Sequence, residues 1–249
     1  ALVAWIGTGA VVGISAVTCI IAALTLFLAV IPQVSAAAAA TSQAGSRVRR
    51  FFQEMAAGVS YLWSGQRMLF FMLCTFALVN FALSPIGPLL PFVAEQRLGL
   101  QAAGFGLLLS SNTVGTMVGS MLVSVIGSRL RRGLGVIWGL VGIGLALIVL
   151  GQVTSAALAV AAFVLMGFSL SICIVCSNTL FQTRVPHDMQ GRVFAVRTSI
   201  SQAAGPIGLA IVGAVSAAVA PHTILLVSGA IVVVGGLIGY AVPGLAAAE

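Results

Sequence analysis

The stretch 181–208, FQTRVPHDMQGRVFAVRTSISQAAGPIG, is the most polar interval between two long apolar runs of this 249-residue chain. Pro186 has no backbone N–H and biases Val185 away from the helical region, so we expect a helix to end just before it. The sequence from Arg184 to Arg192 is then typical of a short connection outside the apolar runs. Asp188 and Arg192 are four residues apart, a spacing that allows them to pair once a helix restarts.

The second half of this stretch carries polar side chains into an apolar run that begins at Val193. These side chains are Arg197, Thr198, Ser199, Ser201 and Gln202. A polar face on a membrane-spanning helix needs partners or water, so we expect this helix to face the interior of a helix bundle.

The composition identifies lipid as the solvent of this chain. Hydrophobic residues make up 60% of it and charged residues only 6%, with a mean hydropathy of +1.19, whereas soluble domains average roughly 25% charged residues. Only helices and closed barrels satisfy their backbone inside a bilayer. The apolar runs last about 20 residues without a period of two, which predicts an all-α integral membrane protein.

The charged and sulfur-containing residues exclude several other classes. The net charge is +7 and every basic residue is an arginine, but the arginines sit in short loops, where they set orientation and contact anionic lipid. We therefore expect the lipid bilayer, and no nucleic acid, as a partner. The four cysteines lie inside apolar runs, so we expect packing roles, no disulfide framework and no metal site or other cofactor.

Hydropathy divides the chain into seven predicted spans after a short remnant at 1–6. The spans are 10–31, 68–94, 103–126, 134–151, 156–182, 194–219 and 223–242. The segment 34–46 is rich in Ala and Ser and is predicted to be flexible. The segment 47–63 has apolar residues at helical spacing, which favours an amphipathic helix on a membrane surface over a disordered linker. Because the chain begins within an apolar run, we expect it to be a piece of a longer protein.

The arginines predict the orientation of these spans. With this number of spans, every arginine except Arg97 falls on one side of the membrane. The positive-inside rule makes that side cytoplasmic, so the C-terminus and the segment 34–66 are predicted to be cytoplasmic.

The positions of Asn and Gln divide the last six spans into two groups. Asn or Gln side chains occur in 68–94, 103–126, 156–182 and 194–219, whereas 134–151 and 223–242 carry no Asn, Gln or charged residue. This predicts four helices that line a cavity and two peripheral ones. The resulting order is a unit of three helices used twice, as in secondary transporters.

Several short motifs occur in an order and at spacings that resemble one known family. They are Gly58-Val-Ser-Tyr-Leu62, Leu90-Pro-Phe92, Leu98-Gly-Leu100 ahead of Gly104-x-Gly106, and Val185-Pro-x-x-x-x-Gly-Arg-Val193. Together they resemble the C-terminal half of a major facilitator superfamily transporter, in particular the bacterial exporter branch that contains macrolide efflux proteins and the enterobactin exporter.

This resemblance implies a domain organisation and a location. It implies a polytopic helix bundle, the C-terminal six-helix half of the major facilitator fold together with the preceding helix. Residues 1–33 would be the end of the fifth helix and the sixth helix, 34–66 a cytoplasmic linker with an amphipathic helix, and 67–249 the C-terminal six-helix transport bundle. The implied location is the bacterial inner membrane, and the implied partner is a missing N-terminal half of the same transporter.

The loop 127–133 resembles the superfamily's Gly-x-x-x-Asp-Arg-x-Gly-Arg-Arg signature without its Asp. The family role is a cytoplasmic latch made of charge contacts. The residues that this role implies here are Gly127, Arg129, Arg132, Asp188, Gly191 and Arg192. A second interpretation gives the arginines only the task of setting orientation, and both remain open.

Gly205-Pro206-Ile207-Gly208 resembles the Gly-Pro antiporter signature. Pro206 removes one helix hydrogen bond and the glycines allow close approach, which predicts a helix bend at a packing seam, centred on Gly205 and Pro206. The seam either moves during transport or is static packing. Gly115-x-x-x-Gly119 and Gly235-x-x-x-Gly239 are predicted to be further packing faces.

The function that these features predict is secondary active transport by alternating access, in which small amphipathic compounds such as drugs or siderophores are exported. The predicted substrate cavity carries Asn80, Ser84, Asn112, Asn178 and Gln202. The resemblance implies coupling to protons, with the titrating carboxylate in the absent half. Arg197 is expected to extend to the cytoplasmic surface, although pairing with a substrate or a carboxylate is also open.

Two alternatives remain open at this stage. One is a membrane scaffold or assembly subunit that does not transport, and the other is a transporter of one narrow metabolite. An enzyme is not expected, because no metal cluster or acid–base pair has suitable spacing.

Overall fold

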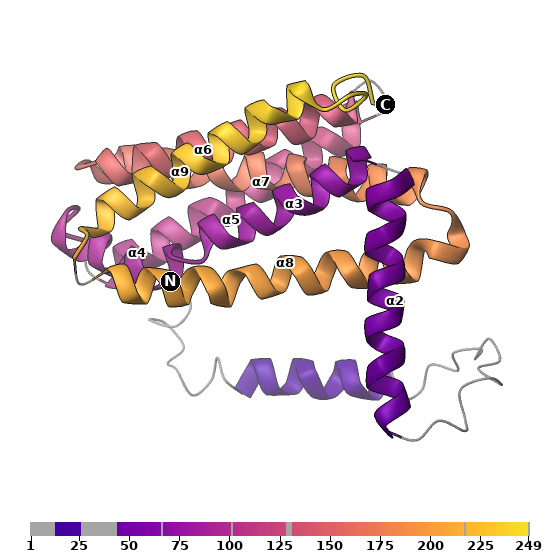
Figure 1. Cartoon of the computed structure of the whole chain (residues 1–249). Coiled ribbons are helices and arrows are strands. Elements are labelled where there is room, and N and C mark those ends of the chain that lie inside the picture. Colours follow the sequence, from indigo (N-terminus) through magenta and orange to yellow (C-terminus); the bar gives the residue numbers. More distant parts are fainter. Residues whose placement is uncertain are drawn as a thin grey trace. The chain divides into compact units, whose positions relative to one another are not determined.

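The regular elements that the structure describes are all helices. The structure is a computed structural model that describes residues 13–25, 44–65, 67–100, 102–127, 131–216 and 218–248. Figure 1 labels eight helices, which are α2 (Ala44–Gly65), α3 (Arg67–Leu83), α4 (Ile86–Gln96), α5 (Ala102–Ile126), α6 (Arg132–Gln152), α7 (Ala156–Arg184), α8 (His187–Val215) and α9 (Pro221–Ile238). The 3-10 helix η1 (Gly239–Ala241) follows α9.

The chain divides into two compact units, Ala1–Phe51 and Phe52–Glu249. The first contains an apolar helix, Gly13–Thr25, which lies within the predicted span 10–31. Its threonine hydroxyls donate to carbonyls of the same helix, as in the 2.8 Å bond from Thr18 Oγ1 to the oxygen of Ile14. The ends of that predicted span, the remnant 1–6 and residues 34–43 lie outside the described residues.

The second unit contains six spans that are long and apolar enough to cross a membrane, counted over the described residues with α3 and α4 as one. This confirms the six spans predicted between residues 68 and 242. Most predicted boundaries agree with the helices to within a few residues, but two regions differ.

The first difference is a break in the predicted span 68–94, which the structure divides at Ser84 and Pro85 into α3 and α4. Pro85 has no N–H to donate to the oxygen of Phe81, four residues earlier. The Oγ of Ser84 donates to that oxygen instead, at 2.8 Å. The predicted span 68–94 was continuous through this proline, so the break is a correction to it.

The second difference is the length of the connection before α8. The sequence predicted that helix from 194, but α8 begins at His187, so only Val185 and Pro186 separate it from α7. Proline favours positions at the beginning of a helix, where its missing N–H costs nothing. The motif that contains Gly191 and Arg192 is therefore helical.

The packing of the spans shows an internal repeat of two helix triplets. If α3–α4, α5 and α6 form the first triplet and α7, α8 and α9 the second, then the pair α3·α8 corresponds to the pair α7·α5. The pair α6·α7 corresponds to α9·α3, and α6·α9 pairs the third members of both triplets. Figure 1 shows α6 and α9 side by side. The contacts thus follow the repeat that the polar residues predicted.

These pairs form an arc in the order α5, α7, α6, α9, α3 and α8, with α5 and α8 at its ends, and α4 makes smaller contacts with α5 and α9. The most apolar 18 residues of α6 are 67% buried, compared with 22% for α5 and 11% for α8. The expectation that 134–151 is peripheral is therefore wrong within this chain. Lack of polar residues shows that a helix avoids water, but it does not distinguish lipid from protein as its neighbour.

Glycines bring the backbones of the paired helices into contact. A Cβ at Gly115 would collide with the carbonyl oxygen of Val164 on α7, and a Cβ at Gly167 would collide with that of Asn112 on α5. At Gly235 on α9 a Cβ would lie 2.6 Å from Leu78 Cδ2 of α3. The glycine pairs predicted from sequence therefore lie at helix contacts, as small residues do in membrane proteins.

The C-terminal segment packs on the beginning of α6. The N–H of Gly133 donates to the carbonyl oxygen of Ala248 at 3.1 Å, and Leu245 and Ala248 are buried. Gly133 is the second residue of α6, so this bond satisfies one of the four amide groups that a helix leaves free at its start.

The second half of α2 packs against the core of the second unit. Leu62 is fully buried, Met55 and Val59 are partly buried against the core, and a Cβ at Gly58 would lie 2.8 Å from Val196 Cγ2 of α8. The predicted helix is present, but this part of its apolar face contacts protein. Its placement on a membrane surface remains a prediction.

We expect Gly167→Ala to destabilise the bundle, because the added methyl group would displace α5 from α7. The free energy of unfolding should fall by about 1–3 kcal/mol, measured as a lower melting temperature in detergent. The matched control is Gly106→Ala on α5, where a Cβ has no neighbour within 4 Å and the melting temperature should not fall. Equal melting temperatures for the two variants would contradict the close packing of α5 on α7.

Candidate functional site

A buried arginine joins three helices of the second unit. Arg197 of α8 is 8% exposed, and its Nη1 donates to Oδ1 of Asn178 on α7 at 2.7 Å. Its guanidinium carbon lies 4.4 Å from the ring centroid of Phe76 on α3 and 4.7 Å from that of Phe181 on α7. The ring of Phe194 is 5.9 Å away.

This environment explains how the bundle holds a cation. Each aromatic face attracts a guanidinium by about 0.5–2 kcal/mol, and the amide oxygen of Asn178 adds a charge-assisted hydrogen bond. The sequence led us to expect that Arg197 extends to the cytoplasmic surface, and that expectation is wrong within this chain. The neighbouring rings and Asn178 hold the side chain inside.

Two buried hydroxyl groups belong to residues that are close in sequence to Arg197 or to its partner Asn178. Ser201 follows Arg197 by one helical turn, and Ser177 precedes Asn178 directly. Within the described residues, neither Oγ has a hydrogen-bond partner. Buried polar groups are normally paired, so this part of the bundle carries unused capacity for hydrogen bonds.

The structure places the five predicted cavity residues on four helices and the α3–α4 turn. The Asn80 amide donates to the Phe76 oxygen at 3.0 Å, one turn earlier in α3. The Asn112 amide crosses from α5 to the Phe163 oxygen on α7 at 3.2 Å. Ser84 closes the α3–α4 turn as described above.

The remaining two residues differ in exposure. Asn178 is half-buried and accepts the hydrogen bond of Arg197, whereas Gln202 on α8 is exposed. Three hollows of the bundle are lined by other residues. The role of the five residues in a cavity therefore remains a proposal.

The predicted latch residues lie at the ends of α5, α6 and α8. Gly127 follows α5, and Arg132 begins α6 and lines a hollow with Cys176 and Thr179. Arg129 lies outside the described residues. Gly191 is exposed in the first turns of α8, with no atom within 4 Å of a Cβ placed there.

Asp188 and Arg192 lie on the same helix, but the structure does not pair them. Nη1 of Arg192 approaches the sulfur of Met189 at 3.9 Å instead, and both charged side chains are exposed. The expected pair within one face of the helix is thus absent from this structure.

The predicted bend lies within a continuous helix. α8 runs through Gly205 and Pro206 without a break, and Gly205 has open space where a Cβ would be. The close contact is at Gly208, where a Cβ would collide with Ser84 Oγ and would lie 2.6 Å from the Phe81 oxygen. The packing seam therefore joins α8 to the break between α3 and α4.

At the opposite end of the bundle, Arg97 connects the end of α4 to the end of α6. Its Nη1 donates to the carbonyl oxygen of Gly151 at 2.7 Å, one of the carbonyls left free at the end of α6. Arg97 also lines a hollow of about 160 Å³ with His222 and Gln96. Within the described residues, no three His, Cys, Asp or Glu side chains are placed to hold a metal ion.

The aromatic environment of Arg197 was not predicted from the sequence, although a signal for it was present. Phe194 precedes Arg197 by three residues, and Phe181 follows Asn178 by three, so each pair shares one helix face. An arginine in an apolar run with an aromatic residue at that spacing favours a buried cation. The contribution of Phe76 could not be found this way, because it comes from a distant helix.

We expect Asn178→Ala to lower the free energy of unfolding by about 1.5–3 kcal/mol, because Arg197 would lose its charge-assisted hydrogen bond while remaining buried. Thermal melting of the purified protein in detergent measures this loss. Asn80→Ala is the matched control, since the Asn80 amide bonds only within its own helix and should cost less. A larger loss for Asn80→Ala would contradict the role given to the Arg197 site.

Comparison with known proteins agrees with this architecture. The family model of the Major Facilitator Superfamily matches residues 1–209 and 84–247. Macrolide efflux protein A of Enterococcus faecalis is 25% identical over 206 residues, which cover 80% of this chain and 60% of that protein. The enterobactin exporter EntS of Citrobacter koseri is 31% identical over 139 residues, covering 56% of this chain and 33% of EntS.

A third relative is the multidrug efflux pump Tap of Mycobacterium tuberculosis, 27% identical over 145 residues, which cover 58% of this chain and 35% of Tap. The chain thus spans between about one third and three fifths of the length of these relatives. The family model covers more than half of the chain, and six described helices can cross a membrane. This multi-pass membrane protein therefore belongs to the major facilitator superfamily.

Proposed function

We propose that this chain forms one half of a secondary active transporter that exports small amphipathic compounds by alternating access. The observation that carries the proposal is that α5 and α8, at the two ends of the series of principal helix pairs, are the least buried spans of the second unit. In alternating access, two such bundles rock against each other around a central site. The missing N-terminal half would cover these two helices.

The exposed surfaces of α5 and α8 support this role. Each combines apolar residues, such as Met117 and Ile207, with polar ones, such as Ser120 and Gln202. A surface that faced only lipid would not need the polar residues. Apolar walls with a few polar anchors suit amphipathic compounds, and Gln202 is the predicted cavity residue that is freest to act as such an anchor.

The contact between α3, α4 and α8 offers a place for the conformational change. The break at Ser84 and Pro85 lies against Gly208, two residues beyond Pro206. Both helices therefore lack backbone hydrogen bonds near the same seam. We propose that this seam moves during transport, and that the arginines and Asp188 at the ends of the helices act as the cytoplasmic latch.

The direction and coupling of transport form the remaining part of the proposal. The arginine distribution favours a cytoplasmic C-terminus, and the relatives are named as a macrolide efflux protein, an enterobactin exporter and a multidrug efflux pump. We therefore propose drugs or siderophores as substrates and protons as the coupling ion. Glu95 and Asp188 are exposed near helix ends, so the carboxylate that carries the proton would come from the missing half.

The test is an accumulation assay with the full-length protein in a bacterium that lacks its main efflux pumps. Expression should lower the accumulation of a fluorescent macrolide or dye severalfold, and a protonophore should abolish the difference. Gln202→Ala should weaken export, whereas Gln152→Ala at the exposed end of α6 should not. Unchanged accumulation over a broad panel of compounds would favour a narrow metabolite transporter or a non-transporting scaffold.

Pro206→Ala tests the moving seam. The substitution restores an N–H that can donate to the oxygen of Gln202, so it should preserve or raise the melting temperature, given a cost of about 3 kcal/mol for proline in helix interiors. If the seam moves, the stiffer helix should lower the export rate severalfold in the same assay. A variant that exports at the normal rate with unchanged stability would show that the seam is static packing.

A further inference from the structure

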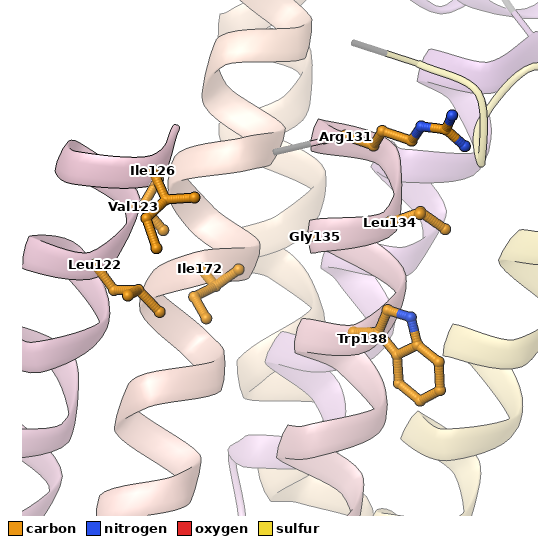
Figure 2. A pocket seen from close by; sticks show the side chains of 8 residues that line it. All are labelled: Leu122, Val123, Ile126, Arg131, Leu134, Gly135, Trp138 and Ile172. Carbon is orange, nitrogen blue, oxygen red and sulfur yellow. The ribbon is translucent and has the colours of Figure 1, made fainter. Parts of the chain in front are cut away.

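An apolar groove runs along the bundle between α5 and α6, with α7 as its floor. It encloses about 490 Å³ and is lined by Leu122 and Ile126 of α5, Ile172 of α7, and Leu134 and Trp138 of α6. Arg131, directly before α6, lines its end. Figure 2 shows Arg131 at the level of Ile126, and Trp138 further along α6, about two helical turns away.

A second hollow continues the groove at the charged end. It encloses about 150 Å³, shares Val123 with the first, and is lined by Arg132 and Thr179. Ile172 in the first hollow and Thr179 in the second lie seven residues apart on α7, which places them on one helix face. The combined groove therefore has two arginines at one end and an apolar body.

The groove opens to the side of the bundle. Ile126 is 40% exposed and Trp138 is 58% exposed, although both are large apolar residues. α5 and α6 each pack on other helices, α5 on α7 and α6 on α7 and α9. The space between α5 and α6 is thus left for an occupant from the surroundings, which for a multi-pass membrane protein are lipids.

We propose that this groove binds one anionic phospholipid, with an acyl chain along Trp138 and Ile172 and the phosphate at Arg131 and Arg132. A guanidinium presents paired donors that fit phosphate oxygens, and basic pockets beside membrane helices are suited to anionic head groups. No acidic side chain lines either described hollow, so nothing there repels the phosphate. The proposal does not depend on the transport function.

Trp138 provides a direct probe of occupancy. In the full-length protein, all other tryptophans would be replaced by phenylalanine, and the protein would be placed in bilayers with brominated phosphatidylglycerol or brominated phosphatidylcholine. Bromine quenches indole fluorescence on contact. We expect phosphatidylglycerol to bind about fivefold more tightly at this site, and we expect added salt to reduce the preference.

Matched variants test the two ends of the groove. Arg131→Gln should bring the affinity ratio of phosphatidylglycerol to phosphatidylcholine down toward one, and Arg131→Lys should keep most of that ratio. Arg184→Gln, an equal charge change at the exposed end of α7, should leave the ratio unchanged. Ile172→Phe should fill the floor and reduce quenching by both lipids. Ile174→Phe, on an exposed position of the same helix that does not line the groove, should not. Size-exclusion elution identifies variants that fail to fold.

Three outcomes would overturn the proposal. Equal quenching by the two lipids in the unsubstituted protein would show that the groove holds only ordinary annular lipid. A preference that survives Arg131→Gln together with Arg132→Gln would place the head group elsewhere. Absence of quenching, or its loss when a transported compound is added at constant lipid, would mean that protein or substrate occupies the groove.

Discussion

Close approach of helix backbones is the constraint on which this bundle depends. Between helices in lipid there is no hydrophobic driving force, since the surrounding acyl chains are as apolar as leucine, and association relies on dense packing and hydrogen bonds. The principal helix pairs meet at glycines, such as Gly167 between α7 and α5, Gly144 between α6 and α9, and Gly208 between α8 and α3. These contacts fix the arc, and the arc determines which surfaces remain available for function.

Arg197 shows how the same tightly packed bundle admits a charge. Its guanidinium is held by aromatic rings and one amide oxygen, so α3, α7 and α8 converge on a cation that forms no ion pair within the described part of the chain. The attraction between a guanidinium and a ring face depends less on the orientation of the guanidinium than a bidentate bond to a carboxylate does. The three helices can therefore shift slightly around Arg197 without losing all of its stabilisation at once.

Much of the fold could be predicted from hydropathy and from the positions of polar residues, because both report directly on the bilayer. The six spans of the second unit follow from hydropathy and the three-helix repeat from the Asn and Gln positions, but local detail depends on contacts that no single segment contains. The break at Pro85 is stable because Ser84 Oγ donates a hydrogen bond to the carbonyl oxygen of Phe81 and because Gly208 leaves room for both residues. Likewise, the burial of α6 depends on its two neighbours, and the site around Arg197 depends on Phe76 from a helix about 120 residues earlier in the chain.

The bond between Gly133 and Ala248 has a consequence for the synthesis of the protein. The beginning of α6 leaves the ribosome more than a hundred residues before Ala248, which accepts the hydrogen bond of Gly133. The packing partner of α6, helix α9, also follows late. α5 and α7, in contrast, can pair as soon as α7 is inserted. The bundle can therefore assemble in stages, and its most buried helix reaches its final environment only when the segment around Ala248 has been made.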